Sequence, residues 1–307
     1  MHLHPPDAPR VDARPPAPWW QPAPGETGSW DIQITEPFDL EAPRAMYVLD
    51  LWSLVPEETT LDYGDDEPVT VPAGALAGKL AELKARTPAP IVICRVSTGA
   101  LRLTDPDASK FPGFEADPPD RPDAMRTGSV IGWSTAEDDP SERFLDTREA
   151  SRAAWAPLMW KRLDLARQIG CDGVEGHRNE MAGSDPGFVL SYDDQVSWFA
   201  EVASQLHARE LSAGMQIVGS AQLIDALAAD HDWLVTYRCA EFNQCDQSRP
   251  FLNLGKAVFA IDHDTDENGE PLENTSILCQ RQQQAMIDEG LIKDAALTSA
   301  VHESCAP

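Results

Sequence analysis

Carboxylate side chains recur in this sequence where short apolar segments end. Asp50, Glu175 and Asp262 each stand at or near the end of such a segment. Two carboxylates on either side of a glycosidic bond can divide its hydrolysis, one acting as acid and the other as base or nucleophile. The pattern therefore predicts an acidic site assembled from the ends of several strands, with these three residues as its catalytic candidates.

Further polar side chains follow the same predicted strands and complete a ring around these acids. They are Gln33, Ser97, Asp146, Arg148, His177, Gln216, Tyr237, Arg238, Glu241, His263 and Asp264. Trp52, Trp133 and Phe188 would offer flat apolar surfaces on which sugar rings stack. For any single acid a solvated surface group is the ordinary explanation, because the chain holds 51 acidic residues. The ring as a set predicts a carbohydrate site.

The elements that must position this ring alternate between strands and helices. Strands are predicted at 30–35, 46–52, 91–97, 143–147, 173–176, 212–218, 233–239 and 257–263, and helices at 74–86, 150–169, 193–209, 220–229 and 276–289. The alternation is typical of an α/β fold. Eight strands predict a (β/α)8 TIM barrel, which takes about 250 residues and carries its active site at the C-terminal ends of its strands. Residues 53–72 and 104–141 are long insertions expected over that face.

The domain organisation follows from composition. Residues 1–24 hold eight prolines and are predicted to form an extended leader. Residues 25–307 are predicted to form one barrel domain that ends in a helical segment.

The charge balance of the chain argues against some classes of binding partner. The chain of 307 residues carries 51 Asp and Glu against 24 Lys and Arg, a net charge of −27. Such a surface repels the phosphates of nucleic acid, and the sequence contains no run of about 18 apolar residues that would cross a membrane. The acidity indicates either a very soluble or salt-adapted surface or attraction of a cationic substrate. Both explanations stay open.

Six cysteines allow up to three disulfides. Four of them lie in polar or C-terminal segments typical of extracellular crosslinks, and we assume the pairs Cys239–Cys245 and Cys279–Cys305. Cys94 and Cys171 border apolar strands, where a buried free thiol is the commoner state. We expect an exported protein that works as a monomer. Because no apolar stretch follows Met1, we expect that any signal peptide has been removed from this chain.

The sequence lacks the motifs that other types of reaction require. No glycine-rich phosphate loop precedes a helix, and no serine stands in a nucleophile-elbow pattern. A possible metal site is formed by Asp262, His263 and Asp264 together with His177. Three successive strand residues cannot all point inward, however, so this set does not predict a metal site. We predict neither a metal nor a cofactor.

From about Trp30 onward the segments resemble glycoside hydrolase family 114, the endo-α-1,4-polygalactosaminidases. The matching segments are WDIQI (30–34), YVLDLWS (47–53), IVICRVSTG (91–99), ERFLDTR (142–148), GCDGVEGHR (170–178), AGMQI (213–217), HDWLVTYRC (231–239) and AVFAIDH (257–263). The resemblance implies a secreted TIM-barrel glycosidase that acts on a galactosamine polymer. Such a polymer is cationic, which would give the net negative charge a reason.

The resemblance breaks at the acidic positions of the family. Glu175 matches the Glu of the family segment EPDN, but His177 stands at its Asp and Arg178 at its Asn, while Glu180 stands at a later Asp. Tyr237 replaces the Glu of the family segment NEQC. These residues therefore belong to the implied site, although two of the family's carboxylates are missing from it.

At two other positions an acid is kept. Asp50 survives as one Asp of the family segment YDID, and Asp262 replaces a Glu. The residues that the resemblance and the ring together assign to substrate binding are Trp52, Ser97, Asp146, Arg148, Arg178, Glu180, Gln216 and Glu241.

Three hypotheses remain. In the first, the protein is a glycoside hydrolase with a rearranged acid set. His177 would then act as general acid or base, since its ordinary pKa lies near neutrality, and Tyr237 would act as nucleophile if Glu241 took its proton. In the second, it is a carbohydrate-binding protein that has kept the groove and lost hydrolysis. In the third, it is a scaffold tethered by the proline-rich leader.

Overall fold

The computed structural model describes residues 17–65, 67–118, 128–135, 141–178, 184–217, 219–272 and 274–306. Its main sheet contains eight parallel strands that pair in chain order. They are β1 (Trp30–Gln33), β2 (Met46–Asp50), β5 (Ile91–Ser97), β9 (Gly173–His177), β10 (Ser212–Gln216), β11 (Trp233–Tyr237), β12 (Val258–His263) and β13 (Glu289–Lys293). A short ninth strand, β14 (Glu303–Ser304), pairs antiparallel with β13.

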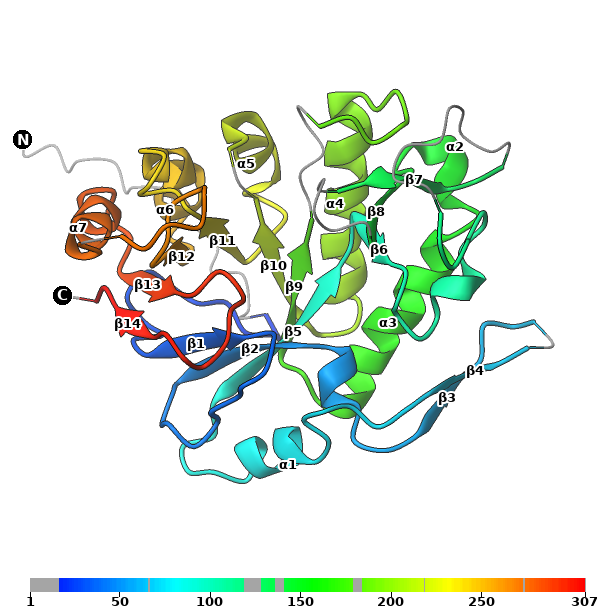
Figure 1. Ribbon diagram of the computed structural model, residues 1–307, viewed down its shortest axis with the longest axis horizontal. Helices are drawn as coiled ribbons and strands as arrows, with labels where there is room; N and C mark the ends of the chain where they lie inside the picture. Colours follow the sequence, from blue (N-terminus) through cyan, green and yellow to red (C-terminus); the bar gives the residue numbers. More distant parts are fainter. Residues whose placement is uncertain are drawn as a thin grey trace, which may run out of the picture.

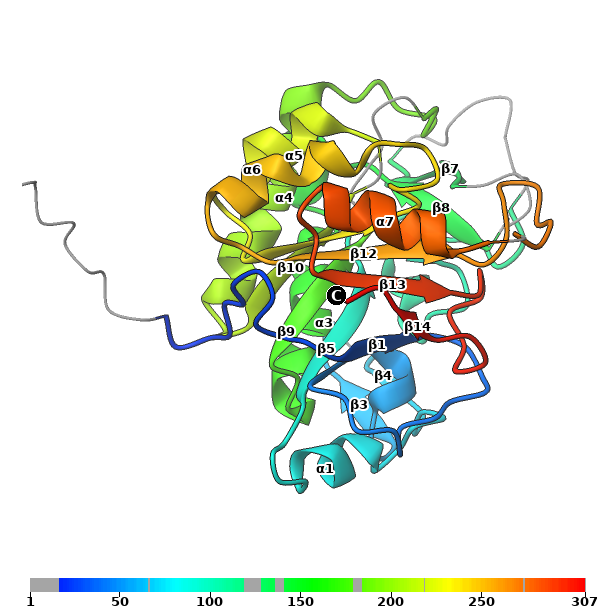
Figure 2. The same ribbon diagram turned by 90° about the vertical axis from the view of Figure 1, so that its left-hand side faces the viewer.

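The sheet curls until its two ends lie beside each other, with β13 and β14 next to β1 (Figures 1 and 2). The side chain of Lys293 on β13 donates to Asp31 on β1 at 2.8 Å, and the Trp30 indole donates to the carbonyl of Glu289. Within the described residues no ladder of backbone hydrogen bonds pairs β13 with β1. The architecture is therefore an α/β fold of the TIM-barrel kind, with its two sheet ends joined through side chains.

Helices cover the outer face of this sheet. They are α1 (Lys79–Lys84), α2 (Glu149–Arg152), α3 (Ala156–Ile169), α4 (Tyr192–His207), α5 (Ala221–Leu227), α6 (Arg249–Asn253) and α7 (Ser276–Gln284). Ser191 and Asp194 form a capping box that begins α4, and Gly170 at φ 101° ends α3. None of the helices is long and apolar enough to cross a membrane within the described residues.

Smaller elements fill the two insertions. A hairpin is formed by β3 (Thr59–Leu61) and β4 (Val69–Val71), and a three-stranded antiparallel sheet by β6 (Ala100–Arg102), β8 (Glu142–Leu145) and β7 (Ile131–Ser134). Short 3-10 turns lie at η1 (Trp52–Leu54), η2 (Ala108–Lys110) and η3 (Cys245–Ser248). The small sheet lies at the strand ends, because Glu142 on β8 accepts a hydrogen bond from Ser97 at the end of β5.

One of the eight predicted barrel strands was wrong. The segment predicted at 143–147 is β8, which belongs to the small antiparallel sheet. The eighth strand of the main sheet is instead β13. It begins at the last residue of the helix that we predicted at 276–289. Its sequence EGLIK hides the strand signal, because Glu289 and Lys293 are charged and yet buried.

Apolar side chains alternate between the two faces of the strands and so form an inner and an outer core. Trp30, Val48, Ile93, Val235 and Phe259 belong to a cluster that contains no helical residue and lies inside the curled sheet. The residues between them, such as those at 47, 92, 94 and 234, pack beneath the helices. Because successive strand residues point to opposite faces, this pattern decides which side chains at the strand ends face inward.

Three disulfides crosslink the outer layer. Cys239–Cys245 and Cys279–Cys305 form as assumed. The expectation of free thiols at Cys94 and Cys171 was wrong, since these residues are bonded to each other. Cys94 lies on β5 and the neighbouring strand β9 begins two residues after Cys171, so the pairing of β5 with β9 brings them together.

Part of the predicted leader is packed against the domain. Trp20 lies against the rings of Trp233 and Phe259, at centroid distances of 6.0 and 6.3 Å. Trp19 stacks on His207 at 4.2 Å and donates to Asp232. Residues 1–16 lie outside the described residues. The folded domain therefore begins before residue 25.

Candidate active site

Inward-facing side chains at the C-terminal ends of five neighbouring strands form a polar cluster, which we call the mouth. The order β2, β5, β9, β10, β11 brings together Asp50, Arg95, Ser97, Glu175, His177, Gln216 and Tyr237. All of them except Arg95 were predicted from the sequence. The mouth therefore confirms that residues distant in the chain meet at one end of the sheet.

Glu175 lies at the centre of the mouth and is fully buried. Neither of its carboxyl oxygens has a hydrogen-bond partner among the described residues, and the Nε atom of Arg95 lies 3.9 Å from Oε2. Burial raises the pKa of the Glu175 carboxyl, while the charge of Arg95 opposes this shift. The residue thus has the environment of a carboxylic acid that holds its proton.

Arg95 links the other residues of the mouth. Its Nη2 atom lies 2.7 and 2.9 Å from the two ring nitrogens of His177, and its guanidinium lies 6.0 Å from the centre of the Tyr237 ring. Sequence analysis missed Arg95. The signal was an arginine within the apolar strand IVICRVS, two positions from the inward-facing Ile93.

The contact with Arg95 favours the neutral form of His177. A guanidinium only donates hydrogen bonds, and a neutral imidazole has one unprotonated nitrogen, so Arg95 can donate to only one of the two ring nitrogens that lie beside its Nη2 atom. Burial and the charges of Arg95 and Arg178 hold the pKa of His177 well below its usual range. His177 is therefore neutral and has no second proton to give as a general acid.

Tyr237 does not make the contact that its expected role required. Its hydroxyl is buried and has no hydrogen-bond partner among the described residues, and burial raises the pKa of the phenol. Glu241, expected to take its proton, pairs instead with Arg238 at 3.3 Å. Nothing in this arrangement activates Tyr237 as a nucleophile.

Asp50 at the end of β2 is the second carboxylate of the mouth. One oxygen accepts hydrogen bonds from the backbone N–H groups of Trp52 and Ser53, and the other accepts from Arg102 at 2.8 Å. Arg102 also pairs with Asp105. These contacts hold the Asp50 carboxylate in one orientation.

A second set of contacts closes the mouth from the side of the small sheet. Buried Glu142 accepts hydrogen bonds from Ser97 at 3.0 Å and from Arg178 at 2.5 Å. The backbone N–H of Arg178, which has a φ of 57°, donates to Gln216. Glu142 was missed as a site residue, because we looked for such residues at the ends of the predicted strands and Glu142 precedes the strand predicted at 143–147.

Asp262 was predicted as catalytic, and its placement contradicts that role. Asp262 lies two residues after Ala260 on β12, so its side chain points outward as that of Ala260 does. It accepts hydrogen bonds from the Gln282 amide on α7 and from the backbone N–H groups of Ala240 and Glu241. Its neighbour His263 points inward, with its ring 6.3 Å from that of Tyr237. Asp262 thus anchors the loop after β11 instead of facing the mouth.

Trp52 and Glu180 were also predicted to bind substrate. Trp52 lies against the guanidinium of Arg162 on α3, at 5.3 Å, so one face of its ring is occupied by a residue of this helix. Glu180 lies outside the described residues. Within the described part of the chain, no group of three His, Cys, Asp or Glu side chains is placed to hold a metal.

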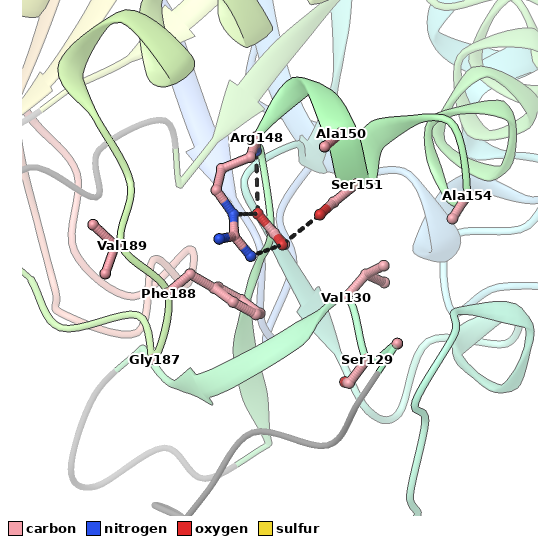
Figure 3. A pocket seen from close by; sticks show the side chains of 11 residues that line it. Ser129, Val130, Arg148, Ala150, Ser151, Ala154, Gly187, Phe188 and Val189 are labelled. Carbon is pink, nitrogen blue, oxygen red and sulfur yellow. Dashed lines mark hydrogen bonds and ion pairs between the residues drawn. The ribbon is translucent and has the colours of Figure 1, made fainter.

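Asp146 and Arg148 lie in a separate hollow of about 530 Å³, which is also lined by Phe188 (Figure 3). Arg148 donates to both oxygens of Asp146, at 2.8 and 2.6 Å, and its guanidinium covers the Phe188 ring at 5.4 Å. One face of the Phe188 ring is occupied in this way, so only its other face could serve as the sugar-stacking surface that we predict.

Comparison with known proteins agrees with this geometry. The sequence model of glycoside-hydrolase family GH114 matches residues 10–307. Among solved structures, Aspergillus fumigatus Ega3 in complex with galactosamine is 25% identical, with a TM-score of 0.69, over 93% of this chain and 97% of that one.

More distant structures share less. A beta-N-acetylhexosaminidase matches at 11% identity and a TM-score of 0.46 over 89% of this chain and 67% of its own, and a maltogenic alpha-amylase from Thermotoga neapolitana at 9% and 0.42 over 85% and 61%. No curated protein matches. The family model spans nearly the whole chain, and the chain therefore belongs to glycoside-hydrolase family GH114.

Proposed function

We propose that this protein hydrolyses glycosidic bonds in a galactosamine-containing polysaccharide, as an endo-α-1,4-polygalactosaminidase-like enzyme. Membership of GH114 and the likeness to Ega3, whose structure holds galactosamine, support a glycosidase with a sugar ligand. The observation that carries the proposal is Glu175, a buried carboxyl group at a strand end with both oxygens unpartnered.

In the proposed reaction Glu175 is the proton donor and Asp50 the second carboxylate. Glu175 gives its proton to the bridging oxygen as the bond between this oxygen and the anomeric carbon breaks. Asp50 either takes a proton from the water that attacks the anomeric carbon or attacks this carbon itself. In the second case water then cleaves the bond between Asp50 and the sugar and gives its proton to Glu175. The fixed contacts of Asp50 with Arg102 and the backbone suit either role.

His177 and Tyr237 have different roles in this proposal. A neutral His177 that accepts from Arg95 and a Tyr237 hydroxyl without an activating base are not proton donors at neutral pH. They line the binding site, where their polar atoms can contact sugar hydroxyls.

One observation favours carbohydrate binding without hydrolysis as the second candidate. The family Asp and Glu positions hold His177 and Tyr237, and each carboxylate of the mouth already lies beside an arginine, as Glu175 does with Arg95. The mouth would then bind the polymer while the chemical step is lost.

Incubation with galactosamine polymers and other amino-sugar polymers, followed by measurement of new reducing ends, separates the candidates. We expect the wild type to release products and Glu175→Gln to be slower by about 10²–10⁴-fold. Glu82→Gln, the same change at an exposed residue of α1, is the matched control and should leave the rate unchanged. Binding of the polymer without product at long times would establish the second candidate.

We further propose that the protein is secreted, that it acts as a monomer and that β13 closes the barrel against β1. Three disulfides favour an oxidising compartment. The buried pair of Lys293 with Asp31 supports barrel closure. Sedimentation would check the monomer, and slow hydrogen exchange in both β1 and β13 would support the closure.

A further inference from the structure

We propose that Arg162 on α3 is a positioning residue for Asp50, the second carboxylate of the proposed reaction. The inference rests on the proposed function and adds to it residues that lie behind the mouth. Two separate routes of contact join Arg162 to Asp50, one for each oxygen of the carboxylate. One route runs through Asp105 and Arg102, and the other runs through Trp52.

The first route is a chain of ion pairs that ends at Oδ2 of Asp50. Arg102 donates to this oxygen from Nη2 at 2.8 Å, and to Oδ1 of Asp105 from Nε at 3.0 Å. Oδ2 of Asp105 lies 3.0 Å from Nη1 of Arg162. Carboxylates and guanidinium groups therefore alternate from the end of β2 to the helix layer.

The second route passes through Trp52, which begins the turn after β2. The backbone N–H of Trp52 donates to Oδ1 of Asp50 at 3.0 Å. The ring of the same residue lies against the guanidinium of Arg162, at 5.3 Å. A displacement of this guanidinium would therefore disturb the supports of both Asp50 oxygens.

Arg162 is itself fixed by residues of the two insertions. It is buried and donates to both oxygens of Asp107, at 3.0 and 2.6 Å. Asp107 also accepts from the hydroxyl of Tyr63, between β3 and β4, at 2.8 Å. The Phe111 ring lies 5.1 Å from the guanidinium. Because a bidentate pair with a carboxylate fixes the plane of a guanidinium, both insertions contribute to the orientation of Arg162.

The carboxylate of Asp105 connects the two arginines of the first route. Burial raises the pKa of Asp105, and the charges of Arg162 and Arg102 oppose this shift. The side chain of Arg102 is 34% exposed, and an ion pair of so exposed an arginine fixes little by itself. The shared, buried Asp105 ties Arg102 to the fixed Arg162, so the Arg102 contact can orient Asp50.

Orientation of Asp50 matters for the rate more than for the affinity. Reacting atoms must approach to about 3–3.5 Å, and a displacement of about 1 Å can lower the rate about 10²-fold. In the proposed reaction Arg162 and Asp105 touch no sugar. Their substitution should therefore lower kcat and leave KM nearly unchanged, whereas a residue that serves folding alone would change neither in a folded variant.

Steady-state hydrolysis of a galactosamine polymer by Arg162→Lys and Asp105→Asn tests the inference. Arg162→Lys keeps the charge but loses the planar fork that contacts two carboxylates, and Asp105→Asn removes the shared charge. We expect kcat to fall about tenfold or more in both variants, with KM within about twofold of the wild type.

A double variant tests whether the effect passes through Arg102. Arg102→Lys alone should also lower kcat. Addition of Arg162→Lys should then lower kcat by less than the single Arg162→Lys change does, because both residues act on the same carboxylate. Losses that multiply in full would contradict the first route.

Arg152→Lys on α2 is the matched control. Arg152 is also buried and pairs with Glu201 at 3.4 Å, but its hydrogen bonds among the described residues reach neither Asp50 nor Arg102. We expect this variant to lose stability and to keep the kcat of the wild type. Thermal unfolding confirms that each variant is folded at the assay temperature.

A wild-type kcat in folded Asp105→Asn would overturn the inference and leave the proposed function intact. This variant decides alone where Arg162→Lys does not fold. A wild-type protein that releases no product from any amino-sugar polymer would instead remove the proposed function, and the inference with it.

Discussion

At the level of single residues, the chemistry of the mouth depends on which group each carboxylate faces. Glu175 and Asp50 were predicted from their positions at strand ends, and both lie in the mouth. Their partners Arg95 and Arg102 were not predicted, because an arginine in a strand gives no sign of the carboxylate that it meets. The sequence thus predicted the acids without predicting their charge state.

The first prediction concerns the pH dependence of the reaction. If Glu175 is the proton donor, hydrolysis requires its protonated form, and burial raises its pKa above the ordinary range of a glutamate. Activity should therefore persist above the ordinary pKa of Glu and fall as pH rises through the raised value. A profile of kcat against pH checks this. A rate that increases steadily through neutral pH, as for an enzyme that needs a deprotonated histidine, contradicts it.

A second prediction concerns Glu289, which is buried on β13. Burial raises its pKa from 4.5 to about 7. The folded state therefore binds this proton more tightly than the unfolded state, so its contribution is full below pH 4.5 and is lost as pH rises to about 7. Across that window the free energy of unfolding should fall by up to about 1.4 kcal/mol per pH unit from this group.

Urea unfolding of the wild type and Glu289→Gln at several pH values measures this contribution. The variant should show a flatter pH dependence and a gain relative to the wild type at pH 8. An identical slope for both proteins would show that Glu289 does not titrate in this range.

At the level of elements, Asp262 belongs to the support of the site. Asp262→Asn keeps the size of the side chain but disturbs the hydrogen bonds from Gln282 and from the backbone of the loop after β11. We expect the free energy of unfolding to fall by about 1–3 kcal/mol, with kcat changed less than tenfold. A loss of activity as large as that of Glu175→Gln, in a folded variant, would restore Asp262 to the catalytic set.

Helix α3 carries another prediction. Arg162 is buried and pairs with Asp105 at 3.0 Å and Asp107 at 2.6 Å, in the insertion after β6. Arg162→Ala leaves the buried Asp107 without its cation and Asp105 with Arg102 alone, and it should cost about 3–5 kcal/mol. Arg167→Ala on the same helix breaks only an exposed pair and should cost less than about 1 kcal/mol. Thermal unfolding compares the two, and equal losses would contradict the account.

The elements that the sequence predicted well are those with a clear apolar period. Seven of the eight predicted strands are parallel strands of the main sheet, and a helix lies within or at each predicted helical range. The failures have physical causes. β13 was not recognised as a strand, because it begins and ends with charged residues that are buried only in the folded structure. The Cys94–Cys171 bond was not predicted, because it depends on which strands are neighbours in the sheet.

At the scale of the whole molecule, the net charge and the mouth have opposite characters. The chain carries −27 overall, but Asp50 in the mouth and Glu142 beside it are each paired with an arginine. In the proposed function, the acidic surface attracts a cationic polymer at long range, while the mouth contacts the sugar at short range. Composition gave attraction of a cationic substrate as one of two explanations for the net charge, and it could not predict the contacts of the mouth.

This division predicts a specific salt dependence. Raising the ionic strength from about 0.01 to 1 M shortens the screening length from about 30 to 3 Å. The association rate of a partly acetylated galactosamine polymer should fall markedly, because long-range steering is screened. An N-acetylgalactosamine dimer without charge should bind with little salt dependence. Stopped-flow or surface-based kinetics test both, and equal salt sensitivity of the two ligands would contradict this division.

The most direct test is a crystal structure of Glu175→Gln with a galactosamine oligosaccharide. The account predicts that the sugar chain crosses the ends of β2, β5 and β9, with a glycosidic oxygen beside residue 175. A chain bound only in the hollow of Arg148 and Phe188, with an empty mouth, would contradict it.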